Sequence, residues 1–315
     1  IFTDATYTAG LNIFTEISKM TAGDMNGDSR PELVLLTRPE GKYQVLTLAN
    51  IGNRFEVLHR FPVEDSLLQQ VEQITLYDMD DDGVLDLLLT GRYSIAQRKG
   101  AIVWYKGRRN RRWSDRTVIE STQYWNRAVK IADLDRDGKD DLYIANFWHE
   151  DVILFDFKGN CNKVTLPKYT NTFQVVIADI FPDGYPDIVR RDNRQINILK
   201  NNGNRMFTEI EPIRLFGTTQ REALYSISAA DINGDGLPDL LLSYYPGENQ
   251  IWLNNGDGTF TGVAEEVQIA HPPVRYFLVA DLDNDGDPDI YGLRPEYNCY
   301  WQNQQRGLKP QMVHW

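Results

Sequence analysis

The chain has 315 residues, of which 42% are hydrophobic, and a formal net charge of −12. This length and composition fit a globular protein with one large domain or two ordinary ones, and no apolar run approaches the length that a membrane span needs. No basic stripe indicates a nucleic-acid partner. We therefore expect an acidic globular protein with neither a membrane span nor bound nucleic acid.

Taken from the N-terminus, the chain contains one aspartate-rich loop of nine residues six times. The first aspartates of successive loops lie 54, 55, 46, 52 and 50 residues apart. A period near fifty residues indicates repeated structural modules. The loops span residues 24–32, 78–86, 133–141, 179–187, 231–239 and 281–289.

Each loop lies between predicted strands. A short apolar strand ending in a small residue precedes it, as in 129–132, and a second apolar strand follows it, as in 240–243. In the same repeat a third strand is expected at 250–253, and the turn 254–259 leads into a fourth. The pattern predicts four strands in each repeat.

The loop residues suit a hard divalent cation. Oxygen ligands at alternate positions, a glycine at the sixth position for a sharp turn and an acid at the ninth suit calcium, whereas magnesium favours a smaller shell and keeps its waters. We expect four to five structural calcium ions. The predicted ligands are Asp24, Asn26, Asp28, Arg30, Glu32, Asp78, Asp80, Asp82, Val84, Asp86, Asp133, Asp135, Asp137, Lys139, Asp141, Asp231, Asn233, Asp235, Leu237, Asp239, Asp281, Asp283, Asp285, Asp287 and Asp289.

Two loops depart from this pattern. The first has Ser29 in place of the glycine and Glu32 in place of the last aspartate, and because both changes keep the oxygen count we expect it to bind an ion. The fourth has Phe181 and Pro182 where the third-position ligand belongs, and we expect it to hold none.

The loops also share features with an EF-hand and with a metal-free turn. An EF-hand needs flanking helices and a bidentate glutamate at position twelve. The residues at position twelve are Leu35, Leu89, Ile144, Arg190, Leu242 and Gly292. The EF-hand is therefore excluded. An Asp/Gly turn without metal is the remaining alternative, and it explains one loop better than it explains four complete copies.

Four strands in each of six repeats predict an all-β fold, a single β-propeller of six four-stranded blades over residues 1–315. Residues 1–10 are expected to form a closing or extra edge strand. Residues 308–313 also fit the outer strand of the last repeat, so seven blades with one rudimentary blade is the alternative. The expected blades span residues 11–62, 63–122, 123–168, 169–215, 216–268 and 269–315.

The loop pattern Ala-Asp-x-Asp/Asn-x-Asp-Gly-x-x-Asp, with the segment Asn-Asn-Gly-Asp-Gly-Thr-Phe-Thr at 254–261, resembles the FG-GAP/VCBS repeat family. This family includes the calcium-binding blades of integrin α-subunit propellers, and the resemblance covers essentially the whole chain. It implies calcium in the loop between the first and second strands, an extracellular or periplasmic location, and a scaffold used mostly for recognition. It names no ligand.

Function is expected on the face opposite the aspartate loops. A strand of five or six residues spans roughly 17–20 Å, so ions in the loops cannot act on a ligand at the far rim. The inner strands enter at that face six residues before each first aspartate, at Ser18, Glu72, Arg127, Phe173, Tyr225 and Arg275. Aromatic residues mixed with Arg, Asn and Glu suit sugars or peptides, although such rings could instead pack between blades. The candidate ligand-binding residues are Tyr124, Trp125, Arg127, Trp148, His149, Tyr245, Arg275 and Tyr276.

Two functions follow from this face. The favoured one is a non-catalytic, lectin-like recognition module that binds a glycan or a partner protein; loops that differ between repeats favour one composite site. The alternative is a carbohydrate-active enzyme such as a polysaccharide lyase. In that enzyme Arg127 and Arg275 would neutralise a uronate, and Tyr124, His149 or His271 would move protons.

Overall fold

The computed structural model describes most of the chain. Its only helix in this part is the single-turn 3₁₀ helix η1 (Pro39–Gly41), and no described helix is long and apolar enough to cross a membrane. The described residues are 17–51, 55–63, 68–94, 99–122, 125–147, 149–159, 161–166, 171–192, 195–214, 223–245, 247–263, 273–280, 288–293, 299–302 and 311–313.

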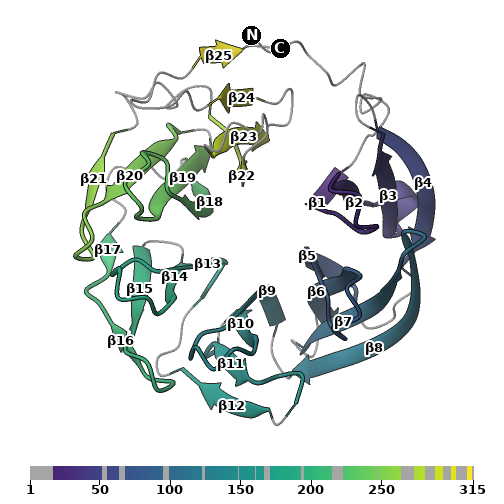
Figure 1. Cartoon of the computed structure of the whole chain (residues 1–315), viewed down its shortest axis with the longest axis horizontal. Helices are drawn as coiled ribbons and strands as arrows, with labels where there is room; N and C mark the ends of the chain where they lie inside the picture. The colour runs from purple at the N-terminus through teal and green to yellow at the C-terminus, as the bar shows by residue number, and fades with distance from the viewer. Residues whose placement is uncertain are drawn as a thin grey trace.

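The strands form antiparallel sheets set around a common centre, with the first strand of each sheet innermost (Figure 1). This is the arrangement of a β-propeller. The first three sheets comprise β1 (Ile17–Gly23), β2 (Glu32–Thr37), β3 (Gln44–Asn50) and β4 (Phe55–Pro62); β5 (Gln70–Tyr77), β6 (Asp86–Ser94), β7 (Lys99–Arg108) and β8 (Arg112–Thr122); and β9 (Trp125–Ala132), β10 (Asp141–Phe147), β11 (Val152–Phe155) and β12 (Asn162–Thr165).

The later sheets continue the order of the chain around the ring (Figure 1). They comprise β13 (Gln174–Ala178), β14 (Asp187–Arg191), β15 (Gln195–Asn201), β16 (Phe207–Glu209) and β17 (Ile213–Arg214); β18 (Ala223–Ala230), β19 (Asp239–Tyr245), β20 (Gln250–Asn254) and β21 (Phe260–Gly262); and β22 (Tyr276–Ala280), β23 (Asp289–Leu293), β24 (Cys299–Gln302) and β25 (Gln311–Val313).

The prediction of six four-stranded blades, or of seven, is wrong. Five of the described sheets have four strands, whereas the sheet that begins with β13 has a fifth strand, β17, paired with β15. The outer edge of this blade is split because Pro212 has no N–H to donate to the ladder. The chain stays paired through the Ile210 N–H, which donates to the Ile198 carbonyl, and pairs again at Ile213.

The second strands are buried along their length because each sheet packs against a neighbour on both faces. All seven residues of β10 except Phe147 are buried, whereas the outer strand β4 alternates between half-buried and exposed residues. The core lies between successive sheets: one cluster joins Tyr143 and Phe155 to Ile188 and Leu199 of the next sheet. Truncating such a buried leucine to alanine typically costs about 2–5 kcal/mol.

Side chains join neighbouring inner strands near the centre of the ring. The Gln73 side chain of β5 donates to the Val129 carbonyl of β9 at 3.1 Å and accepts from the Val129 N–H at 3.0 Å. The Gln174 side-chain oxygen accepts from the Ile227 N–H in the same way, at 2.9 Å. These bonds replace the ladder that diverging strands of separate sheets cannot form.

The two ends of the described ring approach each other at the centre. The ammonium group of Lys19 in β1 lies 5.8 Å from the ring centroid of Tyr276 in β22. The outer strand of the last sheet comes from the same repeat as its other strands, because β25 (Gln311–Val313) pairs with β24. The closing or edge strand predicted at residues 1–10 lies outside the described residues.

Candidate functional site

The aspartate loops are ordered by their own carboxylates. In the second loop the Asp78 carboxylate accepts the N–H groups of Asp82 at 3.1 Å and Gly83 at 2.8 Å. The third loop repeats this, with Asp133 accepting from Asp137 and Gly138. Backbone donors therefore fix the first predicted ligand of each of these loops.

The acid at position nine ties the loop to its sheet. Asp141 is fully buried, and its two oxygens accept the Leu134 N–H at 2.8 Å and the Asp156 N–H at 2.9 Å, which connects the loop to the segment after β11. Burial, more than the neighbouring acids, raises the pKa of Asp141 to about 6. Asp86 makes the equivalent bonds with Met79 and Gly107 in the second loop.

Two of the described loops gather three carboxylates into one cluster. Oxygens of Asp78, Asp80 and Asp86 all lie within 4.8 Å of one another, and the same holds for the corresponding residues of the third loop, 133, 135 and 141. This spacing and the all-oxygen donor set fit a calcium ion. In the first and fifth loops the third position is asparagine, Asn26 or Asn233, which supplies an amide oxygen.

The remaining loops differ from one another. In the fourth loop the Phe181 ring lies against Gly258, where an added Cβ would meet it at 2.5 Å, and Lys200 lies 4.6 Å from the ring centroid. The third-position side chain of this loop thus makes a packing contact in place of an oxygen ligand. Residues 281–287 of the sixth loop lie outside the described residues, as does the side chain of Asp289.

Basic side chains lie on several loops. Arg111 reaches from the second sheet to Asp28 and Glu32 of the first loop, with a contact of 3.1 Å to the Glu32 carboxylate. Arg205 reaches back from the fourth sheet to the third loop, where its Nε lies 2.5 Å from Asp135. These contacts offset part of the negative charge of the loops and join neighbouring blades.

Position six of each described loop has left-handed backbone, which favours glycine. Gly83 and Gly138 have φ of +76° and +87°, whereas the first loop places Ser29 there with φ of +65°. We expect Ser29→Gly to raise the free energy of unfolding by about 1 kcal/mol, because an L-residue in this conformation is strained by about that amount. Urea denaturation in chelator measures the change.

The matched control reverses the exchange in the second loop. Gly83→Ser adds a side chain where no atom lies within 4 Å of the new Cβ, so the new Cβ makes no clash. The only expected cost is the strain of a left-handed backbone at a residue other than glycine. It should lower the free energy of unfolding by about 1 kcal/mol. If both variants shift stability in the same direction, the backbone argument is wrong.

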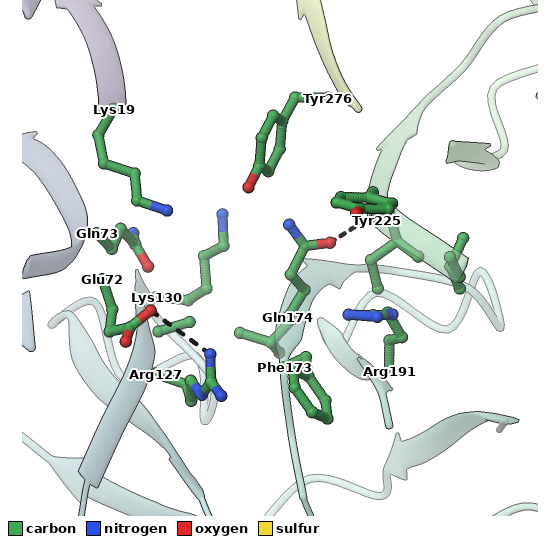
Figure 2. A pocket seen from close by; sticks show the side chains of 14 residues that line it. Lys19, Glu72, Gln73, Arg127, Lys130, Phe173, Gln174, Arg191, Tyr225 and Tyr276 are labelled. Atoms are coloured by element: carbon green, nitrogen blue, oxygen red, sulfur yellow. Dashed lines mark hydrogen bonds and ion pairs between the residues drawn. The ribbon is translucent and has the colours of Figure 1, made fainter. Parts of the chain in front are cut away.

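A cavity of about 420 Å³ lies on the axis of the ring. Every described sheet contributes residues to its wall, and Figure 2 shows side chains from separate strands directed into one space. Its charged lining residues are Lys19, Glu72, Arg127, Lys130 and Arg191. Four cations and one carboxylate make this wall strongly basic, although the whole chain is acidic.

The cavity extends from the end of the strands away from the aspartate loops to Lys130, three residues before the third loop. Arg127 lies near the start of β9, whose last residue Ala132 directly precedes the third loop. Arg191 ends β14, whose first residue Asp187 is the ninth position of the fourth loop. Because Arg191 follows Asp187 by four residues along the extended strand, the two residues lie about 13 Å apart.

β-Bulges direct side chains into the cavity. In four inner strands the residue six positions before the loop has no partner in the second strand: Ser18, Glu72, Arg127 and Tyr225. A bulge breaks the two-residue alternation and re-aims the side chains around it. Three of these four residues line the cavity, whereas the Ser18 hydroxyl donates to the Leu36 carbonyl of its own sheet.

Arg127 is held among aromatic rings beside the carboxylate of the cavity. Its guanidinium carbon lies 4.1 Å from a ring centroid of Trp125, 4.6 Å from that of Phe147 and 4.8 Å from that of Phe173. A guanidinium nitrogen lies 3.5 Å from Glu72, which also accepts from the Trp125 indole N–H at 3.1 Å. Cation–π contacts and one ion pair therefore fix Arg127.

Of the candidate ligand-binding residues, Arg127 and Tyr276 line the cavity, and Trp125 packs beneath Arg127. Arg275 lies outside the lining, 5.7 Å from the ring centroid of the lining residue Tyr225. His149 is half-buried and not among the lining residues. Tyr124, Trp148 and the side chain of Tyr245 lie outside the described residues.

Sequence reasoning missed most of the basic wall. Lys19, Lys130 and Arg191 were not among the candidates, nor was the polar lining residue Gln174. For Lys130, the signal was its place on an inner strand three residues before an aspartate loop. For Arg191, the signal was its place at the end of a second strand, on the face opposite the aspartate loops.

Comparison with known proteins identifies the repeats. The model of the FG-GAP-like repeat matches residues 78–144, 179–242 and 231–292, which is more than half of the chain. The T-cell immunomodulatory protein homolog of Plasmodium falciparum is 24% identical over 302 residues, 90% of this chain and 38% of that protein. Cartilage acidic protein 1 of Xenopus tropicalis is 24% identical over 58% of this chain and 32% of its own length. The chain thus spans about a third of these relatives.

Solved structures share the fold at low identity. A lectin of Agrocybe aegerita, whose structure concerns specific recognition of non-reducing terminal N-acetylglucosamine, matches with a TM-score of 0.59 and 19% identity over 94% of this chain and 79% of that one. BBS1N, solved in complex with ARL6DN, matches with a TM-score of 0.58 and 10% identity over 98% of both chains.

Proposed function

Because the chain belongs to the FG-GAP-like repeat family, we propose that it is a calcium-stabilised, extracellular or periplasmic recognition module that binds a glycan or a partner protein without catalysis. The ligand occupies the axial cavity. The observation that carries the proposal is the composite wall, to which every described sheet contributes different side chains. A volume of about 420 Å³ is within the range of ligand sites.

In this proposal the aspartate loops are scaffold. Bound calcium would neutralise the loop carboxylates, held by the ligands predicted from the sequence in the first, second, third, fifth and sixth loops. The carboxylate clusters of the second and third loops support this role. Arg127 and Arg191 lie at the far ends of their sheets, so an ion in a loop does not contact a ligand in the cavity.

The polysaccharide-lyase alternative has less support from the geometry. Of the residues assigned to it, Arg127 lines the cavity, whereas Arg275 and His149 are not lining residues. Tyr124 and His271 lie outside the described residues. No histidine is found among the described lining residues, so the general base of that alternative has no side chain of this type at the wall.

An array of neutral and acidic glycans, read beside an absorbance assay for unsaturated uronate products, tests the proposal. We expect binding without turnover. Tyr225→Ala should weaken binding about tenfold or more, because it removes an aromatic wall of the cavity. The matched control is Tyr185→Ala, since Tyr185 is also half-buried beneath an arginine, Arg136 at 5.5 Å, but lies in the fourth loop.

Two results would contradict the proposal. Formation of unsaturated product would make the protein an enzyme. Loss of binding in Tyr185→Ala with full binding in Tyr225→Ala would move the ligand to the face of the aspartate loops. A partner protein, if the array is negative, should still lose affinity through the same Tyr225 substitution.

A further inference from the structure

We propose that the axial cavity is a receptor for an acidic saccharide, whose carboxylate or sulfate group binds to Arg191 in a wall that Lys130 makes more basic. This inference rests on the proposed recognition function and names the class of its ligand. It is carried by the charge of the wall, by a buried guanidinium that forms no ion pair with a described residue, and by the polar and aromatic groups around it.

The charge of the wall is strongly one-sided. Figure 2 shows the amino groups of Lys19 and Lys130 directed toward the space into which the Tyr276 hydroxyl points, with Arg191 on the other side of Gln174. The single carboxylate of the lining, Glu72, is already engaged by Arg127 and Trp125. Among the residues that the structure describes, no acidic group forms an ion pair with the other cations of the wall.

Arg191 is the clearest indication of a missing anion. It is only 9% exposed, and its Nε has no hydrogen-bond partner. Its guanidinium carbon lies 4.9 Å from the ring centroid of Phe173, and Asp192 and Tyr244 lie close enough to act on its charge. Burial and then the charge of Arg127 lower the pKa of Arg191 to about 10. A buried charge without a partner costs several kcal/mol, and an anion in the cavity would offset that cost.

Lys130 adds a second cation of the same kind. Its ammonium group forms no hydrogen bond or ion pair with any residue that the structure describes, and burial lowers the pKa of Lys130. Arg191 would donate charge-assisted hydrogen bonds to a carboxylate or sulfate, which are shorter and roughly twice as strong as neutral ones. The charge of Lys130 would add to the attraction.

The rest of the wall suits a saccharide. Tyr225 and Tyr276 supply rings with a polar end, which sugar rings can stack on and hydrogen-bond to. The Gln174 side-chain oxygen is occupied by the Ile227 N–H, so its amide nitrogen is left to donate into the cavity (Figure 2). An apolar acid would leave these polar groups unpaired, whereas sugar hydroxyls can satisfy them.

Isothermal titration calorimetry on the whole chain tests the inference with methyl β-D-glucuronide, methyl β-D-glucoside and glucose 6-sulfate. The two acidic sugars distinguish carboxylate from sulfate as the source of the anion. We expect at least one of them to bind tenfold or more tightly than the neutral glucoside, and the preference to shrink as salt is raised.

Variants locate the anion. Arg191→Gln and Lys130→Met should each reduce affinity for the acidic sugar about tenfold and leave the weak affinity for the glucoside unchanged. Arg191→Lys, which keeps the charge, should retain part of the preference and guards against a folding defect in Arg191→Gln. The matched control is Lys42→Met, which removes one charge from an exposed residue outside the cavity.

The outcomes separate this inference from the proposed function. Equal affinity for glucuronide and glucoside would overturn the inference that the ligand is an acidic saccharide, but not the proposed recognition function. Formation of unsaturated product from polymers of glucuronide would overturn the proposal that the protein is not an enzyme, but not the inference that its ligand is acidic. If the higher affinity for the acidic sugar persists in both Arg191→Gln and Lys130→Met, the inference is overturned. So does binding of inorganic sulfate with no binding of either acidic sugar.

Discussion

Chelation of calcium is expected to lower the melting temperature of the protein by roughly 10–20 °C. A site saturated at one hundred times its dissociation constant contributes about 2.7 kcal/mol. Because the entropy of unfolding is about 2.1 cal/mol/K per residue, each kcal/mol shifts the melting temperature of a chain of this size by about 1.5 °C. Four to five proposed sites account for the size of the effect. Without the ion, the clustered carboxylates of the second and third loops repel one another.

Two asparagine substitutions at position five make this prediction specific to the loops. Asp82 of the second loop and Asp183 of the fourth each accept the backbone N–H two residues later, at 2.9 and 3.1 Å, and each lies beside a lysine. Asn could keep that hydrogen bond in both. Asp82→Asn should therefore reduce the calcium-dependent rise in melting temperature, and Asp183→Asn should leave it unchanged because we expect no ion there.

Differential scanning calorimetry in calcium and in chelator measures both variants. A melting temperature that does not respond to chelator would refute the calcium proposal for all loops. An equal loss in Asp82→Asn and Asp183→Asn would instead refute the assignment of the fourth loop as a loop without metal.

Asp151→Ala is expected to destabilise the fold by about 3–5 kcal/mol, because it removes the nearer and fully buried carboxylate from the buried charge of Arg190 and leaves only Glu209 at 4.0 Å. Asp151 and Arg190 are 0% and 1% exposed and lie 3.2 Å apart. The same carboxylate accepts from the Tyr143 hydroxyl at 2.5 Å and from the Thr172 hydroxyl at 2.7 Å. The pKa of Asp151 is raised, because the effect of burial exceeds the opposing effect of the Arg190 charge.

The matched control is Asp115→Ala. Asp115 also pairs with an arginine, Arg108 at 2.7 Å, but its side chain is 73% exposed. Exposed pairs of this kind contribute about 0–1 kcal/mol. Urea denaturation of both variants should separate them by at least about 2 kcal/mol. Equal effects would show that Asp151 does not hold the third and fourth sheets together as its contacts indicate.

Neither Asp151 nor Arg190 could be chosen from the sequence. Arg190 was notable only as a residue at position twelve that is not the EF-hand glutamate, and Asp151 follows a strand without any recurring pattern. Their importance arises because β14 and the turn before β11 come from different repeats and meet inside the ring. A pair of this type depends on contacts between repeats, and a sequence pattern within one repeat carries no information about such contacts.

Local pattern determined much of the protein by itself. The period near fifty residues and the aspartate loops predicted the repeat family, which the comparisons confirm, and the β-propeller, because ligand spacing and apolar runs are properties of nearby residues. The same reasoning overstated the regularity of the blades. It did not anticipate that Pro212 would interrupt an outer strand and let β17 form a fifth strand.

The tertiary structure alone decided the composition of the cavity. Counting six residues back from each loop reached Glu72, Arg127, Phe173 and Tyr225 of the wall, but in the first and last sheets the next residues, Lys19 and Tyr276, line it instead. The bulges decide which side chains turn inward. Arg191 joins them from a second strand because the ring brings the ends of separate sheets to one axis. The charge that faces a ligand is therefore a property of the assembled ring of sheets, since no single repeat contains it.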